Sequence, residues 1–214
     1  MKRLYPVMLD IEGMRCTVAG GGAVAERKVR GLLDAGADVL VVAPVLTDGL
    51  RELAKQGFIG TLEREYREGD LAGALLAFAA TSDSHVNARV VEDAGRLGVP
   101  VNAADDAAGG SFVTPSVVRR GRLVLAVTAS GSSPALAARV AAELEERYDE
   151  TYTAYTEWLG RLRELAKATV ADAAVRRRLL RAALDVPEEE WRNDTDAGRL
   201  AARADNLLGK LDGG

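Results

Sequence analysis

The chain of 214 residues has little cysteine, little histidine and only 5% aromatic residues. Its single cysteine, Cys16, cannot form a disulfide within the chain, which excludes a disulfide scaffold and favours a reducing, cytoplasmic location. Its single histidine, His85, excludes a metal site built from several imidazoles. We expect Cys16 to be a buried, inert thiol, and we expect His85 to be a capping or surface residue rather than a ligand.

The sequence also lacks a long apolar run and an excess of positive charge. Its longest uncharged apolar stretch, Leu71–Ala80, is far shorter than the roughly 20 residues that cross a bilayer. Asp10 and Glu12 interrupt the segment in which a signal peptide would need its apolar core. The basic residues are dispersed, and the net charge is −4. We therefore expect a cytoplasmic protein that binds neither membranes nor nucleic acid.

The first half of the sequence alternates short β-rich runs with amphipathic stretches. The run at 38–43 is almost continuously apolar, which is typical of a strand buried on both faces of a parallel sheet. Right-handed crossovers between such strands predict an α/β fold with a Rossmann-like, doubly wound parallel sheet. The predicted strands are 15–19, 38–43, 58–65, 75–80 and 99–102, and the predicted helices are 23–34, 48–56 and 84–97.

The pattern changes after residue 112. Apolar runs at 117–118 and 123–127 flank Arg119-Arg120-Gly121-Arg122 and predict an antiparallel hairpin that turns at these residues. Pro134 predicts the first turn of a helix, and the remaining composition is helical with a break at Pro187. The chain is thus predicted to comprise an NAD-binding Rossmann-like domain (1–112), a hairpin-helix segment for dimerisation and substrate (113–149) and a helical C-terminal domain (150–214).

A glycine turn follows the first predicted strand and opens the first predicted helix. Gly20-x-Gly22-x-x-Ala25 has the spacing of a dinucleotide-binding fingerprint. Gly20 would permit the tight turn, Gly22 would let a pyrophosphate approach the backbone, and Ala25 would allow close packing of helix on strand. The N–H groups at the start of the helix would then bind the phosphates. The alternative is a glycine turn with a purely structural role.

Two neighbouring features bear on this hypothesis. The second predicted strand ends in Ala43-Pro44, so it offers no carboxylate for the adenosine ribose. Arg27 and Lys28 follow the turn, where they would either attract a phosphate or form a solvated helix face. The cofactor expected from these features is NAD rather than NADP.

Six short segments, spread in order over about residues 4–150, form a more specific pattern. They are Leu4–Leu9, Val18–Lys28, Ala79–Asp83 with Val86-Asn87, Val101–Asp105, Ser111–Ser116 and Gly131–Ala137. Together they resemble the precorrin-2 dehydrogenase/sirohydrochlorin ferrochelatase family. The resemblance implies a homodimeric enzyme of siroheme biosynthesis that oxidises precorrin-2 to sirohydrochlorin with NAD. In bifunctional members it also implies insertion of ferrous iron as a second substrate.

The resemblance assigns site residues by position. It places Ala23 and Val24 against the cofactor at the glycine turn, Pro44 and Val45 against it after the second strand, and Thr81 beside the nicotinamide. The family likewise has no carboxylate after the second strand, so Ala43-Pro44 agrees with it.

The essential aspartate of the family falls on Asp105. One carboxylate beside the macrocycle would serve as general base, both for the proton lost on oxidation and for the pyrrole protons lost on metal insertion. Asp106 is adjacent, and a loop can present either side chain. No stable metal site on the protein itself is expected, since the sequence has no His/Cys cluster.

The substrate that the resemblance implies is rich in carboxylates and needs cationic or N–H-donating partners. The candidates are Arg119, Arg120 and Arg122 on the hairpin and Ser132 and Ser133 at the next helix N-terminus. A solvated hairpin tip is the alternative for each arginine. The family can carry a phosphorylated serine in the loop before this helix, but the aligned residue here is Ala129.

The helical tail and the overall function each leave two hypotheses open. Tyr152, Tyr155, Trp158 and Leu162 form a stripe at helical spacing that would either contact the macrocycle or pack in a core or dimer interface. An NAD(H)-sensing regulatory module with a helical partner-binding tail is the alternative to the enzyme. Asp105 and the block from Phe112 to Pro134 favour the enzyme, since a sensor needs neither a loop carboxylate nor an anion-binding slot.

Overall fold

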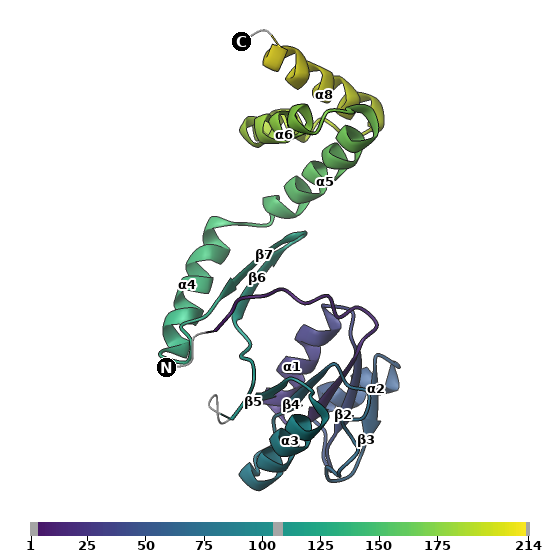
Figure 1. The fold of residues 1–214 in the computed structure, drawn as a ribbon, viewed down its shortest axis with the longest axis vertical. Helices are drawn as coiled ribbons and strands as arrows, with labels where there is room; N and C mark the ends of the chain where they lie inside the picture. Colours follow the sequence, from purple (N-terminus) through teal and green to yellow (C-terminus); the bar gives the residue numbers. More distant parts are fainter. Residues whose placement is uncertain (1–3, 105–108, 213–214) are drawn as a thin grey trace. The chain divides into compact units, whose positions relative to one another are not determined.

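The computed structural model describes residues 4–104 and 109–212. The chain forms two compact units: Met1–Thr114 with Ser130–Ser132, and Pro115–Ala129 with Ser133–Gly214 (Figure 1). Each unit is described by itself. The division into three domains stays a prediction, because compactness alone does not test which segments act independently.

A five-stranded parallel sheet forms the centre of the first unit. Its strands lie in the order β3-β2-β1-β4-β5, and all neighbours pair in parallel. This order is that of the dinucleotide-binding half of a Rossmann fold, so the predicted α/β class is confirmed. The elements are β1 (Arg15–Ala19), α1 (Ala23–Leu33), β2 (Asp38–Val42), α2 (Asp48–Lys55), β3 (Ile59–Leu62), β4 (Leu76–Ala79), α3 (Ser84–Leu97) and β5 (Val101–Ala103).

Every predicted strand and helix of this unit is present, with ends that differ by a few residues. Two strands differ most: β3, expected at 58–65, ends already at Leu62, and β5, expected at 99–102, begins only at Val101. Pro100 has no N–H to give to a ladder, so the pairing starts after it. Its carbonyl instead accepts a hydrogen bond from the backbone N–H of Ala77 at 2.9 Å.

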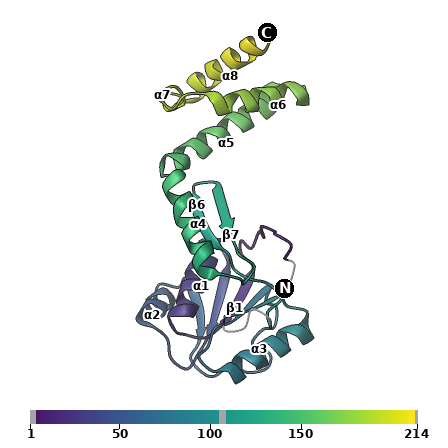
Figure 2. The same ribbon diagram turned by 90° about the vertical axis from the view of Figure 1, so that its left-hand side faces the viewer.

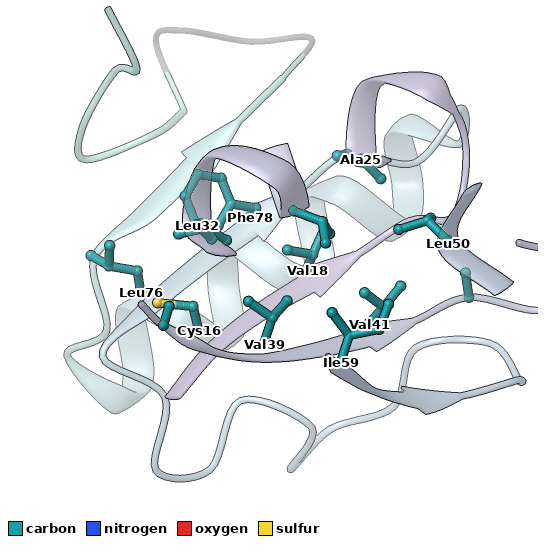
Figure 3. Close-up of a cluster of buried hydrophobic side chains, with 14 of the residues drawn as sticks. Cys16, Val18, Ala25, Leu32, Val39, Val41, Leu50, Ile59, Leu76 and Phe78 are labelled. Atoms are coloured by element: carbon teal, nitrogen blue, oxygen red, sulfur yellow. The ribbon is translucent and has the colours of Figure 1, made fainter. Parts of the chain in front are cut away.

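Helices cover both faces of the sheet (Figure 2). On one face, Val18 of β1 and Phe78 of β4 pack with side chains of α1 and α2, including Leu32 and Leu50 (Figure 3). On the other face, the small side chains of Ala77 and Ala79 lie in the cluster that includes Val90 and Ala94 of α3. Cys16 belongs to the first cluster and is fully buried, as expected.

The second unit begins with an antiparallel hairpin of β6 (Ser116–Arg120) and β7 (Leu123–Val127). Its turn contains only Gly121 and Arg122, and Gly121 adopts a φ of +56°, which a glycine tolerates. The expected turn was therefore too long, because Arg119 and Arg120 belong to β6 and pair with Val124 and Leu123. Edge strands of this kind tolerate charged residues well.

Helices make up the rest of the second unit: α4 (Pro134–Arg147), α5 (Thr151–Thr169), α6 (Ala173–Ala182), the 3-10 helix η1 (Ala183–Asp185), α7 (Glu188–Trp191) and α8 (Ala197–Asp212). Pro134 occupies the first turn of α4, and Ser133 caps it with a hydroxyl that accepts from the N–H of Leu136 at 3.1 Å. Trp158 and Leu162 are buried in the helical core, which confirms the packing interpretation for these two residues. Over the described ranges, no helix is long and apolar enough to cross a membrane.

Candidate dinucleotide site

In the glycine turn between β1 and α1, the first two glycines are crowded by neighbouring backbone and the third is open. A Cβ on Gly20, whose φ is +130°, would lie 2.3 Å from the carbonyl oxygen of Ala80. A Cβ on Gly21 would lie 2.0 Å from the carbonyl oxygen of Val45. A Cβ on Gly22 would meet no atom within 4 Å. The first two glycines are therefore required by the fold, whereas the third leaves space beside the backbone.

The N-terminus of α1 opens into this space. Gly22 is the N-cap residue and, having no side chain, supplies no capping hydrogen bond. The first N–H groups of a helix have no partner within the helix, so those of Ala23 and Val24 are suited to an anionic ligand. Ala25 is fully buried against the sheet, and Val24 is 42% exposed at the mouth of the turn. These positions agree with the separate tasks that the fingerprint predicts for Gly22 and Ala25.

The loop between β2 and α2 lies directly on the glycine turn. The backbone N–H of Thr47 donates to the carbonyl of Gly21 at 2.9 Å. Pro44 and Val45, predicted to contact the cofactor, both lie exposed in this loop, with Val45 69% exposed. The contact between Gly21 and Val45 thus places the loop after β2 beside the glycine turn. Both segments are predicted to contact the cofactor.

Glu26 holds the same loop from α1. Its carboxylate accepts from the hydroxyl of Thr47 at 2.6 Å and from Arg30 in the ion pair at 2.5 Å. The Thr47 hydroxyl and then Arg30 hold the pKa of Glu26 below its ordinary value, since both stabilise the charged form. Sequence reasoning did not single out Glu26 or Thr47.

Thr81 lies at the carboxyl end of β4, on the opposite side of the turn from Val45. Its backbone N is 3.1 Å from the Cβ position built on Gly20. Asn87 of α3 fixes Thr81: its Oδ1 accepts from the Thr81 backbone N–H at 3.1 Å, and its Nδ2 donates to the Thr81 carbonyl at 3.1 Å. The amide of Asn87 is buried and was quoted only as part of a motif. Asn87 therefore holds the backbone of Thr81 in place, and the contact of Thr81 with the nicotinamide stays a prediction.

Lys28 does not belong to a solvated helix face. Its Nζ donates to Oδ1 of Asn102 at 2.7 Å and lies 5.4 Å from the ring centre of Phe78. Burial is the main cause that lowers the pKa of Lys28, and the nearby charge of Arg27 lowers it further. Asn102 in turn donates to the carbonyl of Phe112 at 3.0 Å. Of the two basic residues after the turn, Arg27 is exposed and Lys28 is half-buried.

The predicted general base, Asp105, and its neighbour Asp106 lie outside the described residues. The chain reaches them from Ala104, whose N–H donates to the carbonyl of Ala79 at 2.9 Å. It returns at Ser111, whose N–H donates to the carbonyl of Val101 at 2.8 Å. In the sequence, Asp105 is the second residue after Ala103, the last residue of β5. Its role stays a prediction.

The residues predicted to bind the substrate lie apart from the glycine turn in the sequence and take different local roles. Arg120 is only 11% exposed, and it forms ion pairs with Glu145 at 3.2 Å and Glu150 at 3.4 Å. Arg119 is exposed on β6. Ser132 is exposed, and Ser133 is the N-cap of α4. Their contact with a substrate stays a prediction.

The chain has one imidazole and one thiol that could ligate a metal, His85 and Cys16. His85 is exposed at the start of α3, where its backbone N–H donates to the capping carboxylate of Asp83 at 2.8 Å. No group of three or more His, Cys, Asp or Glu side chains that could hold a metal occurs within 4–104 and 109–212. Burial raises the pKa of the Cys16 thiol, which disfavours the thiolate that a metal would need.

The parallel sheet, the open space at Gly22 and the exposed N-terminus of α1 together define a dinucleotide-binding Rossmann protein. The sequence model of a family described as putative NAD(P)-binding matches residues 7–116. The chain belongs to this family.

Comparisons with known proteins are more specific. The chain is 38% identical to a siroheme synthase of Chromobacterium violaceum over 183 residues, which are 86% of this chain and 39% of that protein. It is 43% identical to a siroheme synthase of Pseudomonas fluorescens over 173 residues, which are 80% of this chain and 37% of that protein. The chain thus spans about two fifths of the length of these relatives.

A solved structure matches over almost the whole length. SirC, a precorrin-2 dehydrogenase, superposes with a TM-score of 0.72 at 28% identity, covering 99% of this chain and 100% of SirC. The resemblance drawn from the sequence motifs is confirmed by these matches.

Proposed function

We propose that this protein is an NAD-dependent precorrin-2 dehydrogenase that forms sirohydrochlorin. The observation that carries the proposal is the likeness to SirC, which extends over both units of the chain. A dinucleotide-binding fold alone would be compatible with many substrates. The siroheme synthases that match the chain support the same tetrapyrrole chemistry.

The residues around the glycine turn fit a nicotinamide dinucleotide. The pyrophosphate would lie in the open space at Gly22, bound by the N–H groups of Ala23 and Val24. Val45 would present its exposed side chain to the adenosine half, and Thr81, fixed by Asn87, would bound the nicotinamide half. When bound, NAD⁺ supplies the hydride acceptor.

NAD rather than NADP is the cofactor in this proposal. The loop from Ala43 to Thr47 contains no lysine or arginine to bind a 2′-phosphate. Beside this loop, the guanidinium of Arg30 is already paired with the carboxylate of Glu26, which also accepts from Thr47. Titrations that compare NADH with NADPH test this choice, and equal affinities would contradict it.

Oxidation of precorrin-2 removes a hydride and a proton, giving sirohydrochlorin, NADH and H⁺. Asp105, after β5, is the proposed acceptor of the proton. Arg119, Arg120, Ser132 and Ser133 are the proposed partners of the substrate carboxylates. Insertion of ferrous iron into the product stays a prediction, with iron as a substrate rather than a resident metal.

A homodimer is part of the proposal. The hairpin of β6 and β7 forms a sheet of only two strands, which contacts α4 and leaves an unpaired edge on each strand. Val117 on β6 is 45% exposed. A second copy that pairs with this hairpin would extend the sheet, and light scattering of the purified protein would measure the resulting mass. A monomer at micromolar concentration would contradict this part of the proposal.

The activity is tested by mixing the protein with NAD⁺ and precorrin-2. We expect NADH to appear together with the change in the absorbance of the macrocycle. NAD(H) binding without either change would favour the sensing module. A separate incubation of sirohydrochlorin with Fe²⁺ or Co²⁺ tests metal insertion independently of the oxidation.

A further inference from the structure

The carboxylate of Glu26 lies where α1, the loop after β2 and the start of α2 meet. A Cβ on Gly49, in the first turn of α2, would lie 2.2 Å from Oε1 of Glu26, so the carboxylate packs directly on the backbone of α2. Its Oε2 accepts from the hydroxyl of Thr47 at 2.6 Å. The dinucleotide fingerprint requires small residues in the turn but no acid after it, so the fingerprint does not explain these contacts.

The same carboxylate holds Arg30. The Nε and Nη2 of Arg30 both donate to Oε1 of Glu26, at 3.1 and 2.5 Å. Charge-assisted hydrogen bonds of this kind fix the direction of a guanidinium as well as its distance. Arg30 is therefore held on Glu26, one residue away from the loop that Thr47 belongs to.

A second ion pair beside this loop is much more open to solvent. Arg51 is 2.8 Å from Asp48 on α2, and the side chain of Asp48 is fully exposed. Exposed pairs within one helix are weak, since water and salt compete with them. The side chain of Glu26, by contrast, is only 21% exposed. Arg30 is thus the arginine whose availability depends on a single, largely covered carboxylate.

This corner of a Rossmann fold normally distinguishes NAD from NADP. A carboxylate after the second strand binds the 2′-hydroxyl of NAD, whereas an arginine nearby binds the 2′-phosphate of NADP. The loop from Ala43 to Thr47 contains neither residue type. Glu26 and Arg30 bring one of each to the loop from α1. While they are paired, their charges cancel and leave no free cation for a phosphate.

We propose that Glu26 sets the preference of this site for NAD over NADP by holding Arg30, and that Arg30 would bind a 2′-phosphate once it is released. The inference rests on the proposed dinucleotide site and names the residue that decides between the two cofactors. It does not depend on which substrate the enzyme oxidises.

Binding measurements on the full chain test the inference without any turnover. The probes are NADH and NADPH, with 5′-AMP and adenosine 2′,5′-bisphosphate as a second pair that lacks nicotinamide. The members of each pair differ only by the 2′-phosphate. Calorimetric titrations of the wild type should show tighter binding of NADH and of 5′-AMP than of their 2′-phosphorylated partners.

The variants release Arg30 and then remove it. Glu26→Gln loses the charge but keeps an oxygen that can accept from Thr47. It should raise the affinity for NADPH about tenfold, as expected for a new charge-assisted hydrogen bond, and change the affinity for NADH less than about twofold. Adding Arg30→Gln to this variant should abolish the gain. Asp48→Asn is the matched control, because it makes the same change in net charge beside the same loop, and it should leave the ratio of the two affinities unchanged.

Three outcomes would overturn the inference. The first is a Glu26→Gln variant that is folded by circular dichroism and binds NADH but gains no affinity for NADPH. The second is a gain that persists without Arg30 or appears equally in Asp48→Asn, since the cation would then not be Arg30. The third is a wild type that binds NADH and NADPH equally. NADH formation from precorrin-2 is measured separately, so a chain that selects NAD through Glu26 but does not oxidise precorrin-2 would contradict the proposed enzyme alone.

Discussion

The hydroxyl of Thr47 donates a hydrogen bond of 2.6 Å to the carboxylate of Glu26. The same hydroxyl oxygen accepts from the N–H of Leu50 at 3.2 Å and so caps α2. One side chain therefore joins the first turn of α1, the loop after β2 and the start of α2. This connection fixes the loop that, in the proposed function, would bound the adenosine half of the cofactor.

We expect Glu26→Gln to lower stability at neutral pH. Because Thr47 and Arg30 hold the folded-state pKa of Glu26 below its ordinary value, its contribution is present above that value and is lost as pH falls through the folded pKa. Unfolding midpoints of wild type and variant should therefore differ at pH 7 and converge in acid, below the lowered pKa of Glu26. Glu63→Gln, at an exposed position, is the control. A difference that does not depend on pH would contradict the electrostatic explanation.

Two neighbouring glycines should respond differently to alanine. Gly21→Ala places a Cβ 2.0 Å from a backbone carbonyl and should cost about 3 kcal/mol of stability. Gly22→Ala has room, and its φ of −86° suits alanine, so its thermal midpoint should stay close to that of wild type. The new methyl group would occupy the proposed pyrophosphate space and weaken NADH binding by about tenfold or more, equivalent to about 1.4 kcal/mol. Unchanged NADH affinity in Gly22→Ala would exclude this placement of the pyrophosphate.

Asp105→Asn should reduce NADH formation from precorrin-2 by about 100-fold or more, as expected for loss of a general base. Affinity for NAD⁺ should change little, since the proposed role is toward the substrate. The measurement is single-turnover NADH formation beside an NAD⁺ titration. Asp106→Asn is the matched comparison, and a larger effect there would transfer the role to Asp106.

The elements of the first unit could be predicted from sequence because their signals are local. The apolar run of β2 and the Gly20-x-Gly22-x-x-Ala25 turn each occupy one short window, and the structure has the expected element there. The length of the hairpin turn was overestimated, because Arg119 and Arg120 are residues typical of loops. In the structure they belong to β6, an edge strand that accommodates their charge.

The contacts that hold the candidate site together could not be predicted in the same way. Lys28 and Asn102 are 74 positions apart, and Thr47 meets Glu26 from 21 positions away. Such pairs depend on how α1 packs on the sheet, which no local pattern specifies. A lysine after a glycine turn therefore appears solvated in sequence, whereas in the fold it lies over Phe78.

The helical core offers a test of the second unit that does not involve any ligand. Asp194 is 4% exposed and accepts from Nε1 of Trp158 at 3.0 Å and from Nε of Arg203 at 3.2 Å. Asp194→Ala should lower the free energy of unfolding of this unit by about 2–4 kcal/mol, because it leaves the buried indole N–H of Trp158 without its acceptor and leaves Arg203 with Glu190 as its remaining carboxylate partner. Asp205→Ala, at an exposed position of α8, should change it by less than about 0.5 kcal/mol. Denaturation followed by tryptophan fluorescence measures both, and equal effects would show that the Asp194 network does not stabilise the unit.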